Sequence, residues 1–200
     1  MSEPIARALS APAPEARDAA RRFADRAAAE HAADLAYAVI ESPLGELLLV
    51  RGRRGLVRVQ YLDQPPEPAL EALARSRSPR IVASRAALEP WERELDEYFA
   101  ERRRRFEAPL DWQQMAPFQR RVLQATAAIP YGTTATYTGV ATRAGNRHAQ
   151  RAAGNALGAN PLPIIVPCHR VLRTGGGLGG YTGGLHRKHY LLALEGALLA

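Results

Sequence analysis

The chain has 200 residues, 46% hydrophobic and 24% charged, which is the composition of a globular protein with one domain or two small ones. Its single cysteine excludes an intrachain disulfide and a zinc site made of four cysteines. The net charge of +7 favours a polyanionic partner, nucleic acid first, but Lys188 is the only lysine among 27 basic residues, so coding bias toward arginine also contributes. We expect no membrane span, no secretory signal and a cytoplasmic location, nucleoid-associated if the protein is bacterial.

Residues 1–34 are predicted to be a disordered or partly helical tail, because they are rich in Ala, Arg and Glu and poor in large apolar residues. Residues 35–108 are predicted to form the first domain. Apolar segments at 37–40, 47–50 and 56–61 are separated by turn residues, which is typical of an antiparallel meander.

Between residues 88 and 99, large apolar side chains recur at helical spacing and predict an amphipathic helix. Four arginines at 102–105 follow it. These arginines are either solvent-exposed at the C-terminal end of the helix, where the helix dipole favours positive charge, or they contact a phosphate backbone.

Residues 109–200 are predicted to form a second, mainly helical domain, reached through a linker at 109–116. Pro117 begins a helix that ends before Pro130, and two short helices at 138–144 and 148–157 form a helix-turn-helix pattern. On the second of these, one face holds Arg151, Gly154, Asn155 and Gly158. Each helical glycine costs about 1 kcal/mol relative to alanine, so we expect a nucleic-acid groove or another helix to approach this face closely.

The lone thiol of Cys168 follows the β-branched run 164–167, which predicts a strand, and His169 comes directly after it. A nucleophilic cysteine needs a base or a cation, whereas a structural one is a small apolar core filler. In extended backbone the two side chains would point to opposite faces, so a bridging water is expected rather than the direct bond of a cysteine peptidase. The glycine-rich run at 175–184 is either a flexible hairpin or the wall of a pocket.

The string Pro167-Cys168-His169-Arg170-Val171 resembles the active-site signature of the O6-alkylguanine-DNA alkyltransferases. Further motifs occur in that family's order and spacing, and the resemblance runs from about Tyr37 to the end: Phe118-Gln119, Ile129-Pro130-Tyr131-Gly132, Thr136-Tyr137, Gln150-Arg151-Ala152, Ala159-Asn160-Pro161, Gly180-Tyr181-Thr182-Gly183-Gly184-Leu185 and Leu191-Leu192-Ala193-Leu194-Glu195. It implies an α/β (α+β) fold. A small ribonuclease H-like N-terminal domain of antiparallel sheet and helix would precede a mainly helical C-terminal domain with a winged helix-turn-helix.

The same resemblance implies DNA repair by direct reversal, an irreversible single-turnover transfer from O6-alkylguanine, and less well from O4-alkylthymine, to Cys168. No cofactor or metal is implied. His169 would be the base, acting through a water, and Glu195 would orient it. Asn160 would brace the active-site turn, and Tyr137 would help to rotate the target nucleotide and assist its ring.

For the DNA and the flipped base, the resemblance implies that Arg151 fills the vacated place in the stack. The remaining implied substrate-binding residues are Tyr137, Tyr181, Thr182, Val171, Pro163 and Gly183. Thr182 stands where serine is frequent in the family, Gly139 stands where a polar helix former is usual, and Gly158 stands where some relatives carry a basic residue.

The implied partner is double-stranded DNA, bound through its minor groove largely independently of sequence by a monomer, with cooperative binding left open. A non-catalytic alkyltransferase-like lesion binder is the main competing hypothesis, against which the thiol at position 168 argues. A helix-turn-helix regulator and a cysteine hydrolase are the remaining hypotheses.

Overall fold

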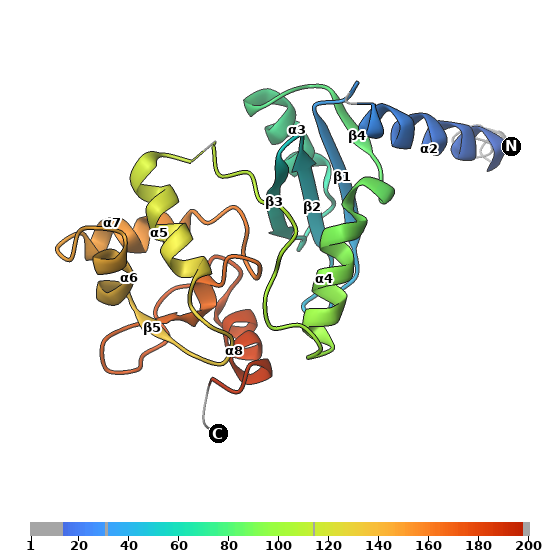
Figure 1. Cartoon of the computed structure of the whole chain (residues 1–200). Coiled ribbons are helices and arrows are strands. Elements are labelled where there is room, and N and C mark those ends of the chain that lie inside the picture. Colours follow the sequence, from blue (N-terminus) through green and yellow to red (C-terminus); the bar gives the residue numbers. More distant parts are fainter. Residues whose placement is uncertain (1–13, 31, 114, 198–200) are drawn as a thin grey trace, which may run out of the picture.

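The computed structural model describes residues 14–30, 32–113 and 115–197, which form two domains side by side (Figure 1). The first part of the predicted tail, residues 1–13, lies outside the described residues. The N-terminal elements are α2 (Pro14–Ala29), β1 (Leu35–Ile40), β2 (Leu47–Gly52), β3 (Gly55–Tyr61), α3 (Glu67–Ser76), β4 (Ile81–Ala83), the short 3₁₀ helix η1 (Ala86–Leu88) and α4 (Glu89–Phe99).

The N-terminal sheet has the strand order β3-β2-β1-β4. Strands β1, β2 and β3 pair antiparallel, which confirms the predicted meander, and β4 adds to β1 in parallel. Because side chains alternate along a strand, Leu47 and Leu49 of β2 join Trp91 of α4 in the larger core, whereas Leu48 packs with Leu73 of α3. Helix α3 was not predicted, and it begins among Pro65, Pro66 and Pro68, residues typical of a break after a strand.

The segment after α4 attaches to the edge of this sheet before it crosses to the second domain. The amide of Leu56 donates to the carbonyl of Pro109, and the amide of Asp111 donates to the carbonyl of Leu56 (2.9 Å each). Gly55 permits this approach, because a Cβ at its φ of +141° would lie 2.3 Å from the Pro109 oxygen. The first residues of the predicted linker are therefore paired with β3.

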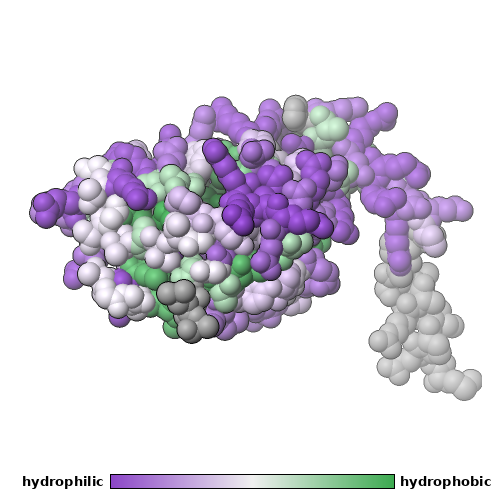
Figure 2. Space-filling model, turned by 60° about the horizontal axis from the view of Figure 1, so that its bottom comes forward, coloured by the Kyte–Doolittle hydropathy of each residue, from purple (hydrophilic) through white to green (hydrophobic). Residues whose placement is uncertain are grey.

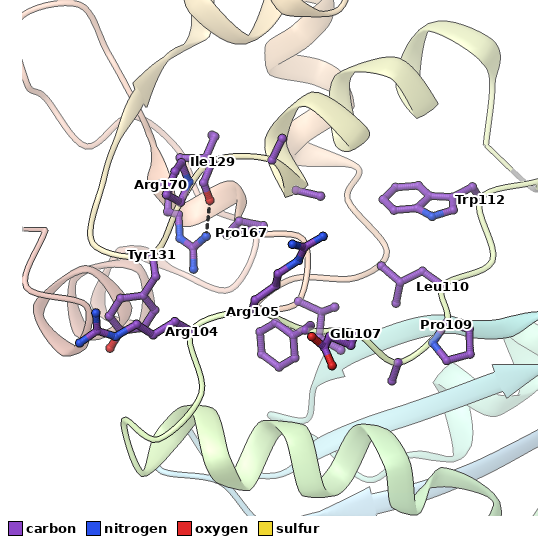
Figure 3. A pocket seen from close by; sticks show the side chains of 16 residues that line it. Arg104, Arg105, Glu107, Pro109, Leu110, Trp112, Ile129, Tyr131, Pro167 and Arg170 are labelled. Atoms are coloured by element: carbon purple, nitrogen blue, oxygen red, sulfur yellow. Dashed lines mark hydrogen bonds between the residues drawn. The ribbon is translucent and has the colours of Figure 1, made fainter.

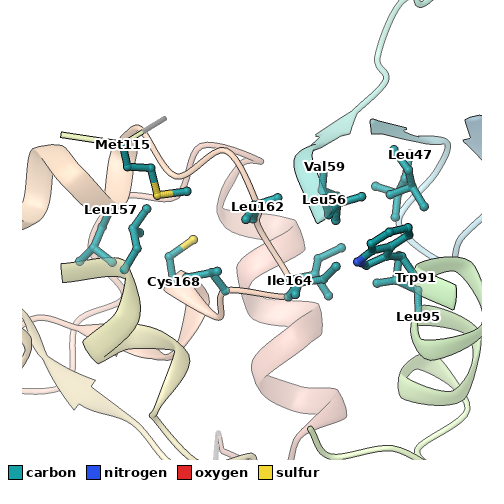
Figure 4. Close-up of a cluster of buried hydrophobic side chains, with 14 of the residues drawn as sticks. Leu47, Leu56, Val59, Trp91, Leu95, Met115, Leu157, Leu162, Ile164 and Cys168 are labelled. Carbon is teal, nitrogen blue, oxygen red and sulfur yellow. The ribbon is translucent and has the colours of Figure 1, made fainter. Parts of the chain in front are cut away.

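The C-terminal domain contains α5 (Pro117–Ala127), β5 (Ala135–Thr136), α6 (Tyr137–Arg143), α7 (Gln150–Gly158), the 3₁₀ helix η2 (Cys168–Arg170), β6 (Val171–Leu172) and α8 (Leu185–Leu194). The two short helices of the predicted helix-turn-helix are present as α6 and α7. One apolar core runs through both domains, from Leu47 and Trp91 to Leu157 and Cys168 (Figure 4). Within the described ranges no helix is both long and apolar enough to cross a membrane.

The predicted strand before Cys168 is wrong. Residues 161–166 form bends and turns, and Cys168 begins η2. The prolines within 161–167 lack amide donors for a ladder, and Ile164 has a φ of +73°. The side chain of Asn160 instead accepts from the amide of Leu162 (3.0 Å) and donates to the carbonyl of Val166 (2.9 Å). The run is apolar because it is buried on all sides, a pattern that does not distinguish a strand from a buried turn.

Helix α2 projects from the sheet domain (Figure 1), and the face of it that Figure 2 shows is mainly hydrophilic, although Phe23 is exposed. Its last turns contact the domain. Ala27 and Ala28 are buried, the Ala28 carbonyl accepts from Arg51 (3.0 Å), and the Asp25 carboxylate accepts from Ser84 (2.6 Å). The described part of the predicted tail is therefore helical. The last turns of this helix pack against the first domain.

Removal of residues 1–32 is expected to lower the free energy of unfolding by roughly 1–3 kcal/mol, since two hydrogen bonds and a small apolar contact are lost. The rate of the C-terminal chemistry should not change, because α2 contacts β4 and η1. Urea unfolding and single-turnover kinetics measure the two effects. A variant that starts at Pro14 retains all of these contacts and is the control. Equal stability of the two truncations would show that the contacts contribute nothing.

Candidate active site

A cavity of about 360 Å³ opens between α7 and the glycine-rich loop, with the thiol of Cys168 in its wall. The lining residues are Tyr137, Gly154, Leu157, Gly158, Cys168, Gly180, Tyr181 and Thr182. Gly154 and Gly158 belong to the small-residue face predicted on α7, whose Arg151 and Asn155 are exposed. The face that permits a close approach therefore borders the cavity that contains the nucleophile.

The Cys168 side chain is held by the turn that precedes it. The Nδ2 atom of Asn160 lies 3.2 Å from Sγ and also donates to the carbonyl of Val166, so one amide joins the thiol to its own turn. Burial raises the pKa of the Cys168 thiol, and the hydrogen bond from Asn160 and the charge of Lys188 oppose this only in part. The resting group is therefore a thiol, and a base must take its proton before it attacks.

His169, the residue predicted to be that base, directly follows the thiol. His169 is completely buried, and its Nε2 lies 2.8 Å from Oε1 of Glu195. Burial lowers the pKa of His169, so the ring is neutral near pH 7. Because the Glu195 carboxylate can only accept a hydrogen bond, the single proton of the ring is placed on Nε2. Nδ1 has no hydrogen-bond partner in the described part of the chain, and the group of His169 that contacts the Cys168 thiol there is its backbone amide. Nδ1 is thus the nitrogen available to accept a proton.

Glu195 is held by more groups than the sequence indicated. Arg170 donates to both carboxylate oxygens (2.8 and 2.9 Å), and Tyr98 of the N-terminal domain donates to Oε1 (2.6 Å). Burial opposes ionisation, but hydrogen bonds from His169, Arg170 and Tyr98 outweigh it and lower the pKa of Glu195 to about 2. Sequence reasoning missed both donors, because Tyr98 was assigned to a helix core and Arg170 received no role.

The aromatic side of the cavity is fixed by the glycine-rich loop. The hydroxyl of Tyr137 lies so close to the loop that a Cβ at Gly179 would fall 2.6 Å from it. The hydroxyl of Tyr181 is 2.8 Å from that of Tyr61 in β3, and Thr182 donates to the carbonyl of Gly158 (2.6 Å). The loop is therefore tied both to α7 and to the N-terminal domain.

Three residues predicted to bind substrate do not line this cavity. Pro163 is buried in the turn between Asn160 and Cys168. The carbonyl of Val171 accepts from Lys188 (2.7 Å). Gly183 is buried against Tyr61, whose ring would lie 2.4 Å from a Cβ at that position. Tyr137, Tyr181 and Thr182, in contrast, lie on the cavity wall.

A larger cavity of about 790 Å³ lies between the interdomain segment and the turn after α5 (Figure 3). Its wall includes Arg104, Arg105 and Arg170 but no cysteine or histidine, so it does not contain the reactive groups. Arg104 lies over the ring of Tyr131 at 5.6 Å, and the neighbouring Arg103 pairs with Glu97 at 2.7 Å. These contacts favour the capping interpretation of the arginine cluster over phosphate binding. The described residues contain no group of three metal-ligating side chains.

A helix-turn-helix beside a buried thiol, whose neighbouring imidazole is bonded to a carboxylate, is an arrangement suited to a cysteine-dependent enzyme that acts on nucleic acid. Residues 35–112 match the ribonuclease-like domain of 6-O-methylguanine DNA methyltransferase, and residues 117–197 match the DNA binding domain of the same family. The chain belongs to this family. The match confirms the predicted family and both predicted domain types.

Individual relatives agree with this assignment. The methylated-DNA–protein-cysteine methyltransferase of Mycolicibacterium paratuberculosis is 42% identical over 159 residues, which cover 80% of this chain and 91% of the relative. The protein of that name from Methanosarcina acetivorans is 37% identical, over 80% and 98% of the two chains. Among solved structures, Mycobacterium tuberculosis OGT in complex with DNA has 39% identity and a TM-score of 0.69, over 80% and 92% of the two chains.

Proposed function

We propose that this protein repairs DNA by direct reversal, moving the alkyl group of O6-alkylguanine to Sγ of Cys168 in a single step. The observation that carries the proposal is the position of the thiol, which opens into a cavity beside α7, while the next residue, His169, is hydrogen-bonded to Glu195. The DNA-bound structure of a relative supports DNA as the partner.

In the proposed reaction, the thiol proton passes through a water to Nδ1 of His169, and Glu195 stabilises the imidazolium that forms. The thiolate attacks the alkyl carbon, the bond between that carbon and O6 breaks, and its electron pair stays on the guanine oxygen. Phenolic donors at Tyr137 and Tyr181, both on the cavity wall, can stabilise that oxyanion. The sulfur ends as a thioether, which thiol exchange cannot reverse.

The target atom lies inside the duplex, so the nucleotide must be rotated out of the stack. The small-residue face of α7 supports an approach through the minor groove, because its glycines let a nucleic-acid backbone come close to the helix. Arg151 is exposed on the same helix and would occupy the gap in the stack. Phosphate contacts should make the binding salt-dependent and largely independent of sequence. A single chain holds all of these groups, which supports action as a monomer.

Transfer is expected to stop after one alkyl group per chain, because the single cysteine has no second thiol to regenerate it. The test is incubation with excess DNA that carries a labelled O6-methylguanine. The tryptic peptide of residues 152–170, which contains Cys168, should gain a single methyl group. The Cys168→Ser variant is the control and should gain none. Product beyond one equivalent, or label on another peptide, would contradict the proposed function.

A further inference from the structure

The larger cavity, of about 790 Å³, takes no part in the proposed alkyl transfer, because Cys168 opens into the smaller one. Its volume is within the range of about 300–1,000 Å³ that is typical of small-molecule sites. One part of its wall is the segment between Arg104 and Trp112, and the rest comes from residues 127–131 and from the turn that leads to η2. A molecule bound there would contact both the interdomain segment and the C-terminal domain.

The wall of this cavity carries an excess of positive charge. Three arginines line it, Arg104, Arg105 and Arg170, together with one acidic side chain, Glu107. Glu195 neutralises Arg170, which leaves two arginines against one glutamate. Among the described residues no ion pair joins Glu107 to any of the three arginines. The cavity is therefore suited to an anion.

Arg105 is the arginine on this wall that has no partner. Arg103 pairs with a glutamate and Arg104 lies over a tyrosine ring, whereas the side chain of Arg105 has no hydrogen bond, ion pair or ring contact within the described residues. Figure 3 shows this side chain extending into the space between Pro167 and Trp112. Its guanidinium is thus free to bind a group that enters the cavity.

Arg170 offers further donors from the other part of the wall, and it is only 5% exposed. A guanidinium has five N–H groups. Two of those of Arg170 donate to Glu195 and one donates to the carbonyl of Ile129 (Figure 3). The remaining two, one on each terminal nitrogen, have no acceptor in the part of the chain that the structure describes. Buried donors of this kind gain from an acceptor in the cavity.

The remainder of the wall is mainly apolar and includes three aromatic side chains, Phe106, Trp112 and Tyr131. The two tryptophans of the chain differ in their hydrogen bonds. The indole N–H of Trp91 donates to a backbone carbonyl at 3.1 Å, whereas that of Trp112 has no acceptor among the described residues. Aromatic side chains favour contact with a flat ring, so the wall combines a surface for a ring with donors for an anion.

We propose that this cavity binds a small molecule in which an aromatic ring carries a carboxylate or a phosphate. Arg105 and Arg170 bind the anionic group, and Trp112 contacts the ring. The planar fork of a guanidinium matches carboxylate and phosphate oxygens equally well, so both kinds of anion fit the site. Because Arg170 also holds Glu195, the ligand would contact the residue that positions this carboxylate. The site does not depend on the proposed alkyl transfer.

Calorimetric titration of the full chain with adenosine monophosphate and with 2-naphthoate tests the proposal and distinguishes a nucleotide from an aromatic carboxylate. At least one of them should bind with a Kd below about 1 mM. The uncharged counterparts, adenosine and 2-naphthylmethanol, should bind about tenfold more weakly or less tightly still. Arg105→Ala should weaken binding of the anion by about tenfold. Ala128→Leu, which places a larger side chain at an exposed position of the wall, should weaken it as well.

Arg102→Ala is the matched control, since Arg102 is an exposed arginine of the same cluster that lies outside the cavity wall. It should bind the ligand as the unmodified protein does, and urea unfolding checks that all three variants are folded. Absence of binding for both anions, or equal affinity of Arg105→Ala and the unmodified protein, would overturn the proposal. Transfer from O6-benzylguanine is measured separately, and its failure would contradict the proposed function without bearing on this site.

Discussion

Replacement of Glu195 by glutamine is expected to slow alkyl transfer by about 10²–10⁴-fold, the usual contribution of general acid–base catalysis. The carboxylate holds the proton of His169 on Nε2 and stabilises the imidazolium, and an amide can do neither as well. Affinity for undamaged duplex DNA should stay nearly unchanged, because Glu195 is buried and is not part of the cavity wall.

Single-turnover kinetics on O6-methylguanine duplex and a separate binding titration measure these two quantities. Loss of the carboxylate also leaves Arg170 without its buried partner, so stability must be measured in parallel. Glu94→Gln is a suitable control, since Glu94 is a buried carboxylate that binds the amides of Glu107 and Ala108 outside the active site. Glu94→Gln should lose stability without losing transfer rate. An unchanged rate in Glu195→Gln would remove Glu195 from the mechanism.

The same variant has a defined effect on acid stability. The pKa of Glu195 is lowered to about 2 from the ordinary glutamate value, so the ionised group stabilises the fold above the unfolded-state pKa. This contribution is lost as the pH falls from the ordinary glutamate range toward 2. Glu195→Gln should lack that part of the pH dependence, which urea unfolding at a series of acidic pH values would reveal.

Replacement of Arg151 by alanine is expected to reduce repair of duplex DNA by roughly ten- to hundredfold, while the reaction with free O6-benzylguanine stays nearly unchanged. Extrusion of a nucleotide costs a few kcal/mol, and a side chain that fills the gap offsets part of that cost. A free base needs no extrusion. Arg151 is exposed and lies outside the cavity wall, so its loss should not disturb the thiol.

Arg147→Ala controls for the loss of one positive charge near the same helix, since Arg147 is also exposed in the helix-turn-helix. It should weaken DNA binding by a salt-dependent amount without selectively slowing transfer from bound duplex. Equal losses of Arg151→Ala on the duplex and the free base would assign Arg151 a structural or catalytic role in place of one in extrusion.

Much of the fold could be predicted from local patterns. The apolar run at 47–50 and the alternation in 56–61 located two strands of the meander, and the spacing of Trp91, Leu95 and Tyr98 located α4. The two short helices of the helix-turn-helix were recognised from their length and the turn between them. The run before Cys168 could not be assigned in this way, since a buried turn and a buried strand are equally apolar.

The sequence by itself determined the nucleophile, its neighbouring histidine, the order of the family motifs and the small-residue face of α7, because each depends on residues close together in the chain. Only the tertiary structure decided which groups complete the site. Tyr98 reaches Glu195 across 97 positions, Tyr61 reaches Tyr181 across 120, and the two domains must dock before either bond exists.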